Sequence, residues 1–217
     1  MKKAFRVGLI RVLTTEDEQV LKAHERQIME YFPELTVETK CIPDQYEGIH
    51  SQELADIAVP KIVETARSFG DVDMILVSCA DDPGLEEIRK AIPGIPVTGG
   101  GETTAALALK YGTCIGVLGI TDYLPRAYQR MIPDKVIAAK PEGVDSTLDL
   151  MTEKGRKAVI RTGLELKEKG AQVLALACTG LATIGIAKEL ETATGLMVID
   201  PVMAEGLFAY FEYLRKR

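Results

Sequence analysis

Aromatic residues and histidine are scarce in this sequence, and tryptophan is absent. Aromatic side chains make up 6% of the 217 residues, and the two histidines are His24 and His50. Neither histidine has a neighbouring pattern of further metal ligands, so we expect no metal site. His24 falls on a segment of mixed polarity and His50 in a loop, and we interpret both as surface residues.

Cysteine is also rare, with four residues that lie far apart in the sequence: Cys41, Cys79, Cys114 and Cys178. No two of them form a Cys-x-x-Cys pair, which argues against a zinc site and against a redox motif. We interpret all four as free thiols. Because free cysteine usually packs as a small hydrophobic residue, we assign Cys41 and Cys114 to the core.

Long apolar runs and blocks of like charge are missing as well. No apolar segment approaches the roughly 20 residues that a membrane-spanning helix needs, and the N-terminus lacks the pattern of a signal peptide. The net charge of -6 arises from 26 basic and 32 acidic residues spread along the chain. We therefore expect a cytoplasmic protein that binds neither nucleic acid nor a membrane surface.

Aliphatic residues are abundant, in short runs that alternate with segments of helical period. Apolar runs predict strands over 5–10, 36–41, 73–78, 114–119, 135–139 and 172–177. Helical periodicity predicts helices over 16–31, 52–69, 83–91, 102–110, 123–131, 153–168, 181–191 and 202–216. Continuous apolar strands linked by helices are typical of parallel sheets covered on both faces. The predicted fold class is therefore α/β.

Two segments of the chain resemble each other. Residues 73–97 and 172–198 share an aliphatic strand, a cysteine, a turn containing Gly-Leu and a helix. A second short strand is then expected to start at Gly94 in the first segment and at Gly195 in the second. A period near 100 residues is too long for a solenoid, so it favours duplication of a half-domain, with two α/β halves meeting near residue 97.

The duplication gives Cys79 and Cys178 equivalent positions, each after a predicted strand and before a predicted helix. Ligands of parallel α/β sheets bind beyond the carboxyl ends of the strands, and a helix N-terminus there lowers the pKa of a thiol. If a pseudo-twofold axis relates the halves, both thiols reach one cleft. One thiolate can then remove a proton from carbon while the other thiol protonates the opposite face. The pattern predicts inversion of a carbon acid.

The residues between the two cysteines predict local structure. Asp82 and Pro83 suit the N-cap and first turn of a helix, while Asp81 either raises the pKa of the neighbouring thiol or caps the same helix. The loop TGGGETT at 98–104 matches no nucleotide-binding pattern, and we expect its backbone N–H groups to bind a substrate carboxylate. Glu102 is interpreted as a first-turn residue without a catalytic role.

Four short boxes resemble those of the aspartate/glutamate/hydantoin racemase family, and most closely those of its hydantoin racemase branch. In chain order they are SCADDPGL at 78–85, GGGETTAAL at 99–107, ALACTGLA at 175–182 and IDPVMAEG at 199–206. The first resembles the Cys-x-x-Asp-Pro-Gly-Leu box of hydantoin racemases. The resemblance covers most of the chain, and the boxes follow one another in the order expected for the family.

The resemblance implies two Rossmann-like lobes related by pseudo-twofold symmetry, residues 1–97 plus 199–217 and residues 98–198, with the active site in the cleft between them. It implies a racemase or epimerase acting on a hydantoin or an amino acid, with Cys79 and Cys178 as the acid/base pair. Neither a metal nor pyridoxal phosphate is then needed, and a homo-oligomer is expected. The substrate-binding residues carried over are Thr14, Ser78, Thr121, Thr179 and Gly180.

The first loop departs from the family, because Arg11-Val12-Leu13-Thr14 stands where members commonly have Asn-Pro-Asn-Thr. This change leaves open a maleate-type cis-trans isomerase, which also uses two cysteines. Arylmalonate-type decarboxylases keep only the second cysteine, so Cys79 argues against that activity. A further alternative is a non-catalytic protein whose two lobes close on a small molecule. A thiol redox protein would require a disulfide between Cys79 and Cys178.

Overall fold

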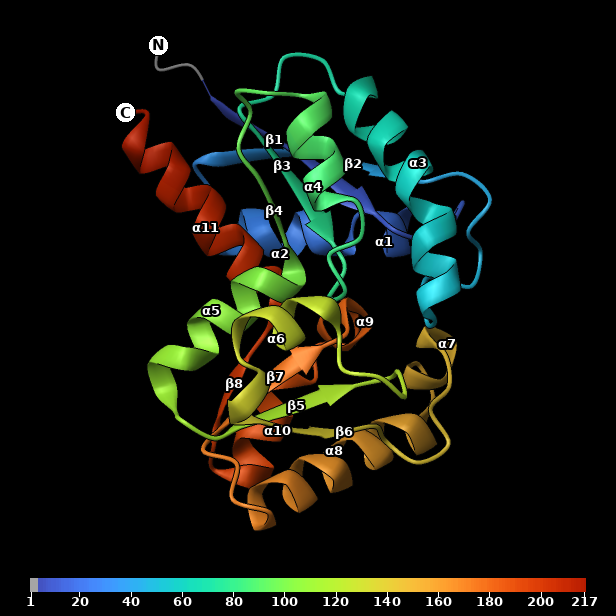
Figure 1. Ribbon diagram of the computed structural model, residues 1–217, viewed down its shortest axis with the longest axis vertical. Coiled ribbons are helices and arrows are strands. Elements are labelled where there is room, and N and C mark those ends of the chain that lie inside the picture. The colour runs from blue at the N-terminus through green and yellow to red at the C-terminus, as the bar shows by residue number, and fades with distance from the viewer. Residues whose placement is uncertain (1–3) are drawn as a thin grey trace.

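Two four-stranded parallel sheets lie one above the other and form the two lobes of the molecule (Figure 1). The structure, a computed structural model, describes residues 4–217. The first sheet has the order β2-β1-β3-β4 and the second the order β6-β5-β7-β8. The strand order is therefore the same in both lobes, which agrees with the duplicated α/β half that the sequence suggests, and the predicted α/β fold class is confirmed.

The strands of the first sheet are β1 (Phe5–Arg11), β2 (Leu35–Cys41), β3 (Met74–Ser78) and β4 (Val97–Gly99). The strands of the second sheet are β5 (Ile115–Gly119), β6 (Val136–Ala139), β7 (Val173–Ala177) and β8 (Met197–Ile199). Every residue of β3, β5 and β7 is buried. Such strands need cover on both faces, which explains their continuous apolar sequences.

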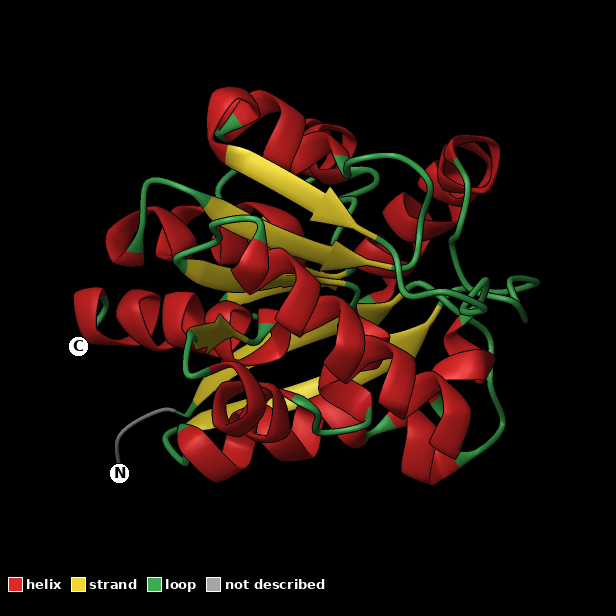
Figure 2. Ribbon diagram, turned by 90° about the horizontal axis from the view of Figure 1, so that it is seen from below, coloured by secondary structure: helices red, strands yellow, loops and turns green. Residues whose placement is uncertain are grey.

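Helices cover both faces of each sheet (Figure 2). The helices that precede β4 are α1 (Glu18–Leu21), α2 (Ala23–Tyr31), α3 (Gln52–Ser68) and α4 (Leu85–Ala91). Those that follow it are α5 (Gly100–Tyr111), α6 (Arg126–Met131), the 3-10 helix η1 (Pro133–Lys135), α7 (Thr147–Leu150), α8 (Glu153–Glu168), α9 (Thr179–Thr183), α10 (Ala187–Thr194) and α11 (Pro201–Arg215).

The hydrophobic core consists of four clusters, two for each sheet. In the first lobe Ile10 packs toward α3 and α4, whereas its neighbour Leu9 packs toward α2 and α11. In the second lobe Leu118 packs toward α8 and α10, whereas Val117 packs toward α5 and α6. Alternate residues of one strand thus serve opposite faces, and both faces are apolar.

Two helices connect the lobes. Helix α5 begins at Gly100, directly after β4, and lies above the second sheet (Figure 1). Helix α11 follows β8 of the second sheet, where Asp200 accepts hydrogen bonds from the N–H groups of Val202 and Met203, and it packs against α2, α5 and β3. The chain therefore returns to the first lobe at its end. The division at residues 97 and 199 stays a prediction.

The six predicted strands are confirmed, each with ends within two residues of the prediction. Two predicted helices are wrong as single elements. The segment 16–31 is interrupted at Lys22 between α1 and α2, and the segment 181–191 is divided at Gly185, whose φ of +63° ends α9. Helix α7 lies in a segment with no expected element. Cys41 and Cys114 are half-buried rather than core residues, which corrects their assignment.

No helix within residues 4–217 is both long and apolar enough to cross a membrane.

Candidate active site

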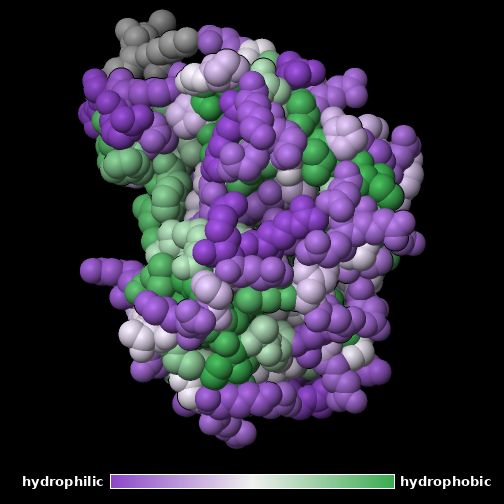
Figure 3. All heavy atoms as spheres, in the orientation of Figure 1, coloured by the Kyte–Doolittle hydropathy of each residue, from purple (hydrophilic) through white to green (hydrophobic). Residues whose placement is uncertain are grey.

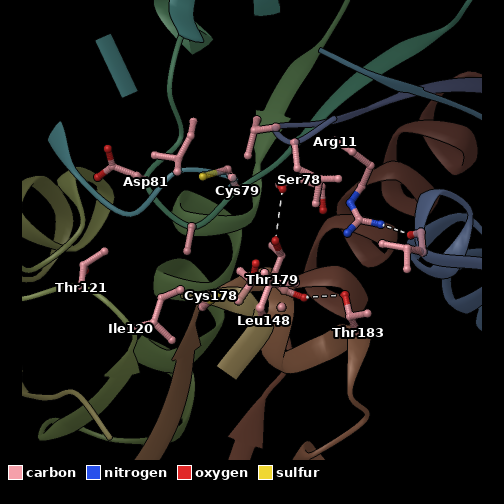
Figure 4. A pocket seen from close by; sticks show the side chains of 18 of the residues that line it. Arg11, Ser78, Cys79, Asp81, Ile120, Thr121, Leu148, Cys178, Thr179 and Thr183 are labelled. Atoms are coloured by element: carbon pink, nitrogen blue, oxygen red, sulfur yellow. Dashed lines mark hydrogen bonds between the residues drawn. The ribbon is translucent and has the colours of Figure 1, made fainter. Parts of the chain in front are cut away.

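A cavity of about 270 Å³ lies between the lobes, where β1, β3, β5 and β7 end. In Figure 4 Cys79 lies on the side of the first lobe and Cys178 on the side of the second. The cavity is lined by all seven residues that the sequence suggests for the site: Thr14, Ser78, Cys79, Thr121, Cys178, Thr179 and Gly180. The structure thus brings these residues together, while their roles stay predictions.

Cys79 follows β3 but does not lie at a helix N-terminus. Helix α4 begins six residues later, at Leu85. Burial raises the pKa of the Cys79 thiol well above its usual value, and the nearby carboxylates of Asp81 and Asp82 raise that pKa further. The expected lowering of this thiol pKa by a helix N-terminus is therefore wrong. Of the two readings of Asp81, the structure favours the one in which its charge raises the pKa of Cys79.

Cys178 differs, because it is the N-cap residue of α9. Hydrogen bonds from the backbone N–H groups of Gly180 and Leu181 lower the pKa of its thiol, and so does the positive charge of Arg11. Burial outweighs these effects and raises the pKa of Cys178 to about 11. The two thiols thus have unequal surroundings, acidic around Cys79 and rich in donors around Cys178.

Asp82 does not cap the helix that follows it, which corrects the prediction. The N-cap of α4 is Gly84, in the left-handed region with a φ of +75°. Asp82 accepts hydrogen bonds from the N–H groups of Gly101, at 2.8 Å, and Glu102, at 2.6 Å, in the first turn of α5. These donors of the TGGGETT loop are therefore occupied by the protein, and the expectation that they bind a substrate carboxylate is wrong.

Thr14 holds two loops of the cavity wall together. Its hydroxyl donates to the carbonyl oxygen of Ile42 at 2.6 Å and accepts from the N–H of Gln45 at 2.8 Å. Its backbone N–H donates to the carbonyl oxygen of Gln45 at 2.9 Å. The loop after β1 is thereby fixed to the loop after β2.

The other threonine hydroxyls are also bonded within the protein. Thr121 donates to the carbonyl oxygen of Tyr123 at 2.7 Å, and Thr179 donates across the lobes to the carbonyl oxygen of Ser78 at 3.2 Å. Gly180 allows close packing at the second thiol, because a Cβ on it would lie 3.3 Å from the sulfur of Cys178. These residues shape the cavity around the two cysteines.

His24 is buried rather than on the surface, and this corrects the prediction. Its side chain is 0% exposed, with Nδ1 2.9 Å from the hydroxyl of Ser78 and Nε2 2.9 Å from the hydroxyl of Thr183. Ser78 in turn donates to Oε2 of Glu205 at 2.9 Å. Burial lowers the pKa of His24 well below its usual value and raises the pKa of Glu205 well above its own. A buried polar network thus lies behind Cys79.

Arg11 is a second buried residue for which no role is expected from the sequence alone. It ends β1 and lines the cavity, and its Nη1 donates to the carbonyl oxygens of Val20, at 2.6 Å, and Leu21, at 3.3 Å. Burial lowers the pKa of Arg11 to about 10. The available signal was an arginine directly after the predicted apolar strand over 5–10.

In the part of the chain that the structure describes, no three His, Cys, Asp or Glu side chains are grouped so that they could hold a metal ion. His50, in contrast to His24, is half-exposed and lies 3.6 Å from Glu47.

The fold and the cavity define a two-lobed α/β protein in which each lobe contributes one cysteine to a shared cavity. Residues 7–205 match the Asp/Glu/hydantoin racemase family, so the chain belongs to that family, as the sequence boxes suggested. Membership places the chain among the racemases, which are isomerases.

A curated relative and two solved structures are similar to the chain. The hydantoin racemase of Paenarthrobacter aurescens is 25% identical over 179 residues, which are 75% of this chain and 70% of the relative. The allantoin racemase of Pseudomonas fluorescens superposes with a TM-score of 0.84, at 20% identity, over 97% of this chain and 92% of that chain. The glutamate racemase of Aquifex pyrophilus superposes with a TM-score of 0.60, at 25% identity, over 95% of this chain and 83% of that chain.

Proposed function

We propose that the protein is a cofactor-independent racemase that inverts C5 of a 5-substituted hydantoin, with Cys79 and Cys178 as the acid/base pair. One observation carries the proposal: the two cysteines follow β3 and β7, the equivalent strands of the two lobes, and line the same cavity. Core packing alone does not require both thiols at strand ends. The similarity to a hydantoin racemase supports the choice of substrate class.

In the proposed reaction, the thiolate of one cysteine takes the proton from C5, and the electron pair of the C–H bond moves onto the neighbouring carbonyl as an enolate. The thiol of the other cysteine then delivers its proton to the opposite face of C5, and the enolate returns to the carbonyl. The roles of the two sulfurs exchange in the reverse direction. The pair supplies both acid and base, so the reaction needs no metal and no pyridoxal phosphate.

The enolate oxygen needs a hydrogen-bond donor in the cavity. The hydroxyl of Tyr123 is buried at the cavity wall and has no hydrogen-bond partner among residues 4–217. Burial raises the pKa of the Tyr123 phenol, so the group stays protonated and able to donate. We assign this hydroxyl to the enolate oxygen.

The proposal is tested by hydrogen exchange in deuterium oxide. Each enantiomer of several 5-substituted hydantoins, of aspartate and of glutamate is incubated with the protein, and loss of the proton signal at the stereocentre is followed by NMR. We expect exchange of hydantoins that is lost in both Cys79→Ser and Cys178→Ser. Cys114→Ser is the matched control, because Cys114 is a half-buried thiol that does not line the cavity.

Absence of exchange with every compound would refute racemisation. Conversion of maleate to fumarate by the same preparation would then assign the two-cysteine site to isomerisation of a double bond. Binding of a hydantoin that is unchanged in both serine variants, without exchange, would instead assign the cavity to a ligand-binding protein.

We also propose that the protein forms a homo-oligomer through α11. Met203, Leu207, Phe211 and Leu214 lie on one face of this helix and are 39%, 41%, 57% and 46% exposed. Figure 3 shows hydrophobic atoms along the left edge of the molecule, where α11 lies. Contiguous apolar surface of this kind is typical of an interface between subunits. Sedimentation of the protein and of a Phe211→Lys variant tests the proposal, which predicts that the variant dissociates.

A further inference from the structure

Asp81 is a buried carboxylate in the wall of the cavity, two residues after Cys79. Its side chain is 5% exposed, and Figure 4 shows it beside Cys79. It occupies one of the two variable positions of the Cys-x-x-Asp-Pro-Gly-Leu box, so it is a feature of this chain rather than of the box. Burial of a carboxylate is costly unless its oxygens find partners.

The protein satisfies only one oxygen of Asp81. Oδ1 accepts a hydrogen bond from the backbone N–H of Arg126 at 2.9 Å. Oδ2 has no hydrogen-bond partner in the described chain, and the nearest charge, Nε of Arg126, lies 3.8 Å away. The Arg126 guanidinium instead donates to Asp56 at 2.8 Å and to Gln52 at 3.1 Å. Oδ2 is thus a buried carboxylate oxygen with an unused capacity to accept a hydrogen bond.

The charges around the cavity disfavour an acidic ligand. Among the described residues that line it, Arg11 is the one cationic side chain, and its Nη1 already donates to two backbone carbonyls. Asp17 and Asp81 are the two acidic lining residues. The lining side chains thus carry two carboxylates and one guanidinium, and this excess of negative charge favours a neutral ligand with N–H groups over one with carboxylates.

We propose that Oδ2 of Asp81 accepts the N1–H of a neutral hydantoin-type ring and so selects such rings over acidic amino acids. The inference takes the ring from the proposed function. N1 is bonded to C5, the carbon that exchanges its proton. A ring whose C5 faces the sulfur of Cys79 can therefore direct its N1–H toward Asp81, two residues further along the loop.

The test uses ligands that bind but do not react. 5,5-Dimethylhydantoin has no proton at C5 and keeps both ring N–H groups, while its 1-methyl and 3-methyl derivatives each lack one of them. Dissociation constants are measured by titration calorimetry for the wild type, Asp81→Asn and Asp17→Asn. Asp81→Asn keeps the size of the side chain and removes its negative charge. Asp17→Asn removes one negative charge from the same cavity and retains a helix-capping side chain.

We expect the wild type to bind 5,5-dimethylhydantoin and the 3-methyl derivative equally, and the 1-methyl derivative at least tenfold more weakly. Asp81→Asn is expected to bind 5,5-dimethylhydantoin at least tenfold more weakly and to lose the discrimination against 1-methylation. Asp17→Asn is expected to keep the discrimination against 1-methylation. Equal binding of 5,5-dimethylhydantoin by Asp81→Asn and wild type would overturn the proposal, as would a preference that depends on N3.

The outcomes separate this inference from the proposed function. Asp81-dependent binding without proton exchange of a 5-monosubstituted hydantoin leaves the inference standing and refutes the racemase. Proton exchange at the wild-type rate in Asp81→Asn, with unchanged affinity, leaves the racemase standing and refutes the role of Asp81. Thermal unfolding of each variant shows whether the fold is kept, and a variant that does not fold is replaced by Asp81→Ser.

Discussion

Nδ1 of His24 and the hydroxyl of Ser78 lie 2.9 Å apart, although 54 residues separate them in the sequence. This contact joins α2 to the end of β3, one residue before Cys79. Because Ser78 also donates to Glu205 of α11, three elements meet at the base of the first cysteine. The position of Cys79 thus depends on a buried polar network.

Replacing His24 by alanine is expected to destabilise the fold by about 2–4 kcal/mol. The change removes a fully buried side chain, together with its hydrogen bond to Ser78 and its hydrogen bond to Thr183. Urea unfolding measures the effect. His50→Ala is the matched control, because His50 is half-exposed, and its effect is expected to stay within about 0.5 kcal/mol. Equal effects of the two substitutions would contradict the role of the network.

Replacing Glu205 by glutamine is expected to change how stability depends on pH. Burial raises the pKa of Glu205 above its usual value of 4.5, so the folded state keeps the proton that the unfolded state loses. This contribution is fully present below pH 4.5 and is lost as the pH rises toward the folded-state pKa, by up to about 1.4 kcal/mol per pH unit. Glutamine does not ionise, so the variant is expected to gain stability relative to the wild type as the pH rises.

Urea unfolding of Glu205→Gln between pH 4 and 8 checks this sign. Glu212→Gln on the same helix, where Glu212 pairs with Arg215 near the surface, shows the effect of an ordinary glutamate substitution. A variant that instead loses stability relative to the wild type as the pH rises would mean that Glu205 is buried as a carboxylate.

The cavity thiols are expected to react slowly with iodoacetamide near neutral pH. Since burial raises the pKa of Cys178 to about 11, about one thiol in a thousand is ionised at pH 8, and the rate should rise about tenfold per pH unit up to pH 10. Cys79 is expected to react more slowly still, because burial and Asp81 raise its pKa and no helix N-terminus lowers it. Peptide mass spectrometry reports each site, with half-buried Cys114 as the faster internal reference. Rapid alkylation of Cys79 at pH 7 would contradict this ranking.

Gly101→Ala is expected to cost about 3 kcal/mol or more. A Cβ there would overlap the carbonyl oxygen of Ala80 and lie 2.9 Å from Oδ2 of Asp82, which holds the start of α5. Gly70→Ala is the control, because within the described chain no atom lies within 4 Å of its added Cβ. That variant should match or slightly exceed the wild type in stability. Similar thermal midpoints for the two variants would show that the first turn of α5 adapts.

The sheets could be predicted because β1, β3, β5 and β7 are buried along most of their length and their sequences are predominantly apolar, with Arg6 and Arg11 as the charged residues of β1. The helix boundaries were harder to predict. Segments 16–31 and 181–191 keep a helical period across their interruptions, and the turn at Gly185 depends on backbone geometry that periodicity does not report.

The cysteines could be singled out because the repeat gave them equivalent positions. The network behind them could not, because the partners of His24 lie 54 and 159 residues away and its own helix is of mixed polarity. Asp82 was assigned to the nearest helix for the same reason. Its partners, Gly101 and Glu102, are 19 and 20 residues downstream, and a local capping rule does not reach that far.

The unequal surroundings of Cys79 and Cys178 have a consequence for kinetics. Two enantiomers have the same free energy in water, so the equilibrium constant for their interconversion is unity. The Haldane relation then fixes the same kcat/KM for both directions, however different the two sulfurs are. For a two-thiol racemase, the carboxylates beside Cys79 and the donors around Cys178 can therefore change kcat and KM but not their ratio. If kcat differs between the two enantiomers, KM differs by the same factor.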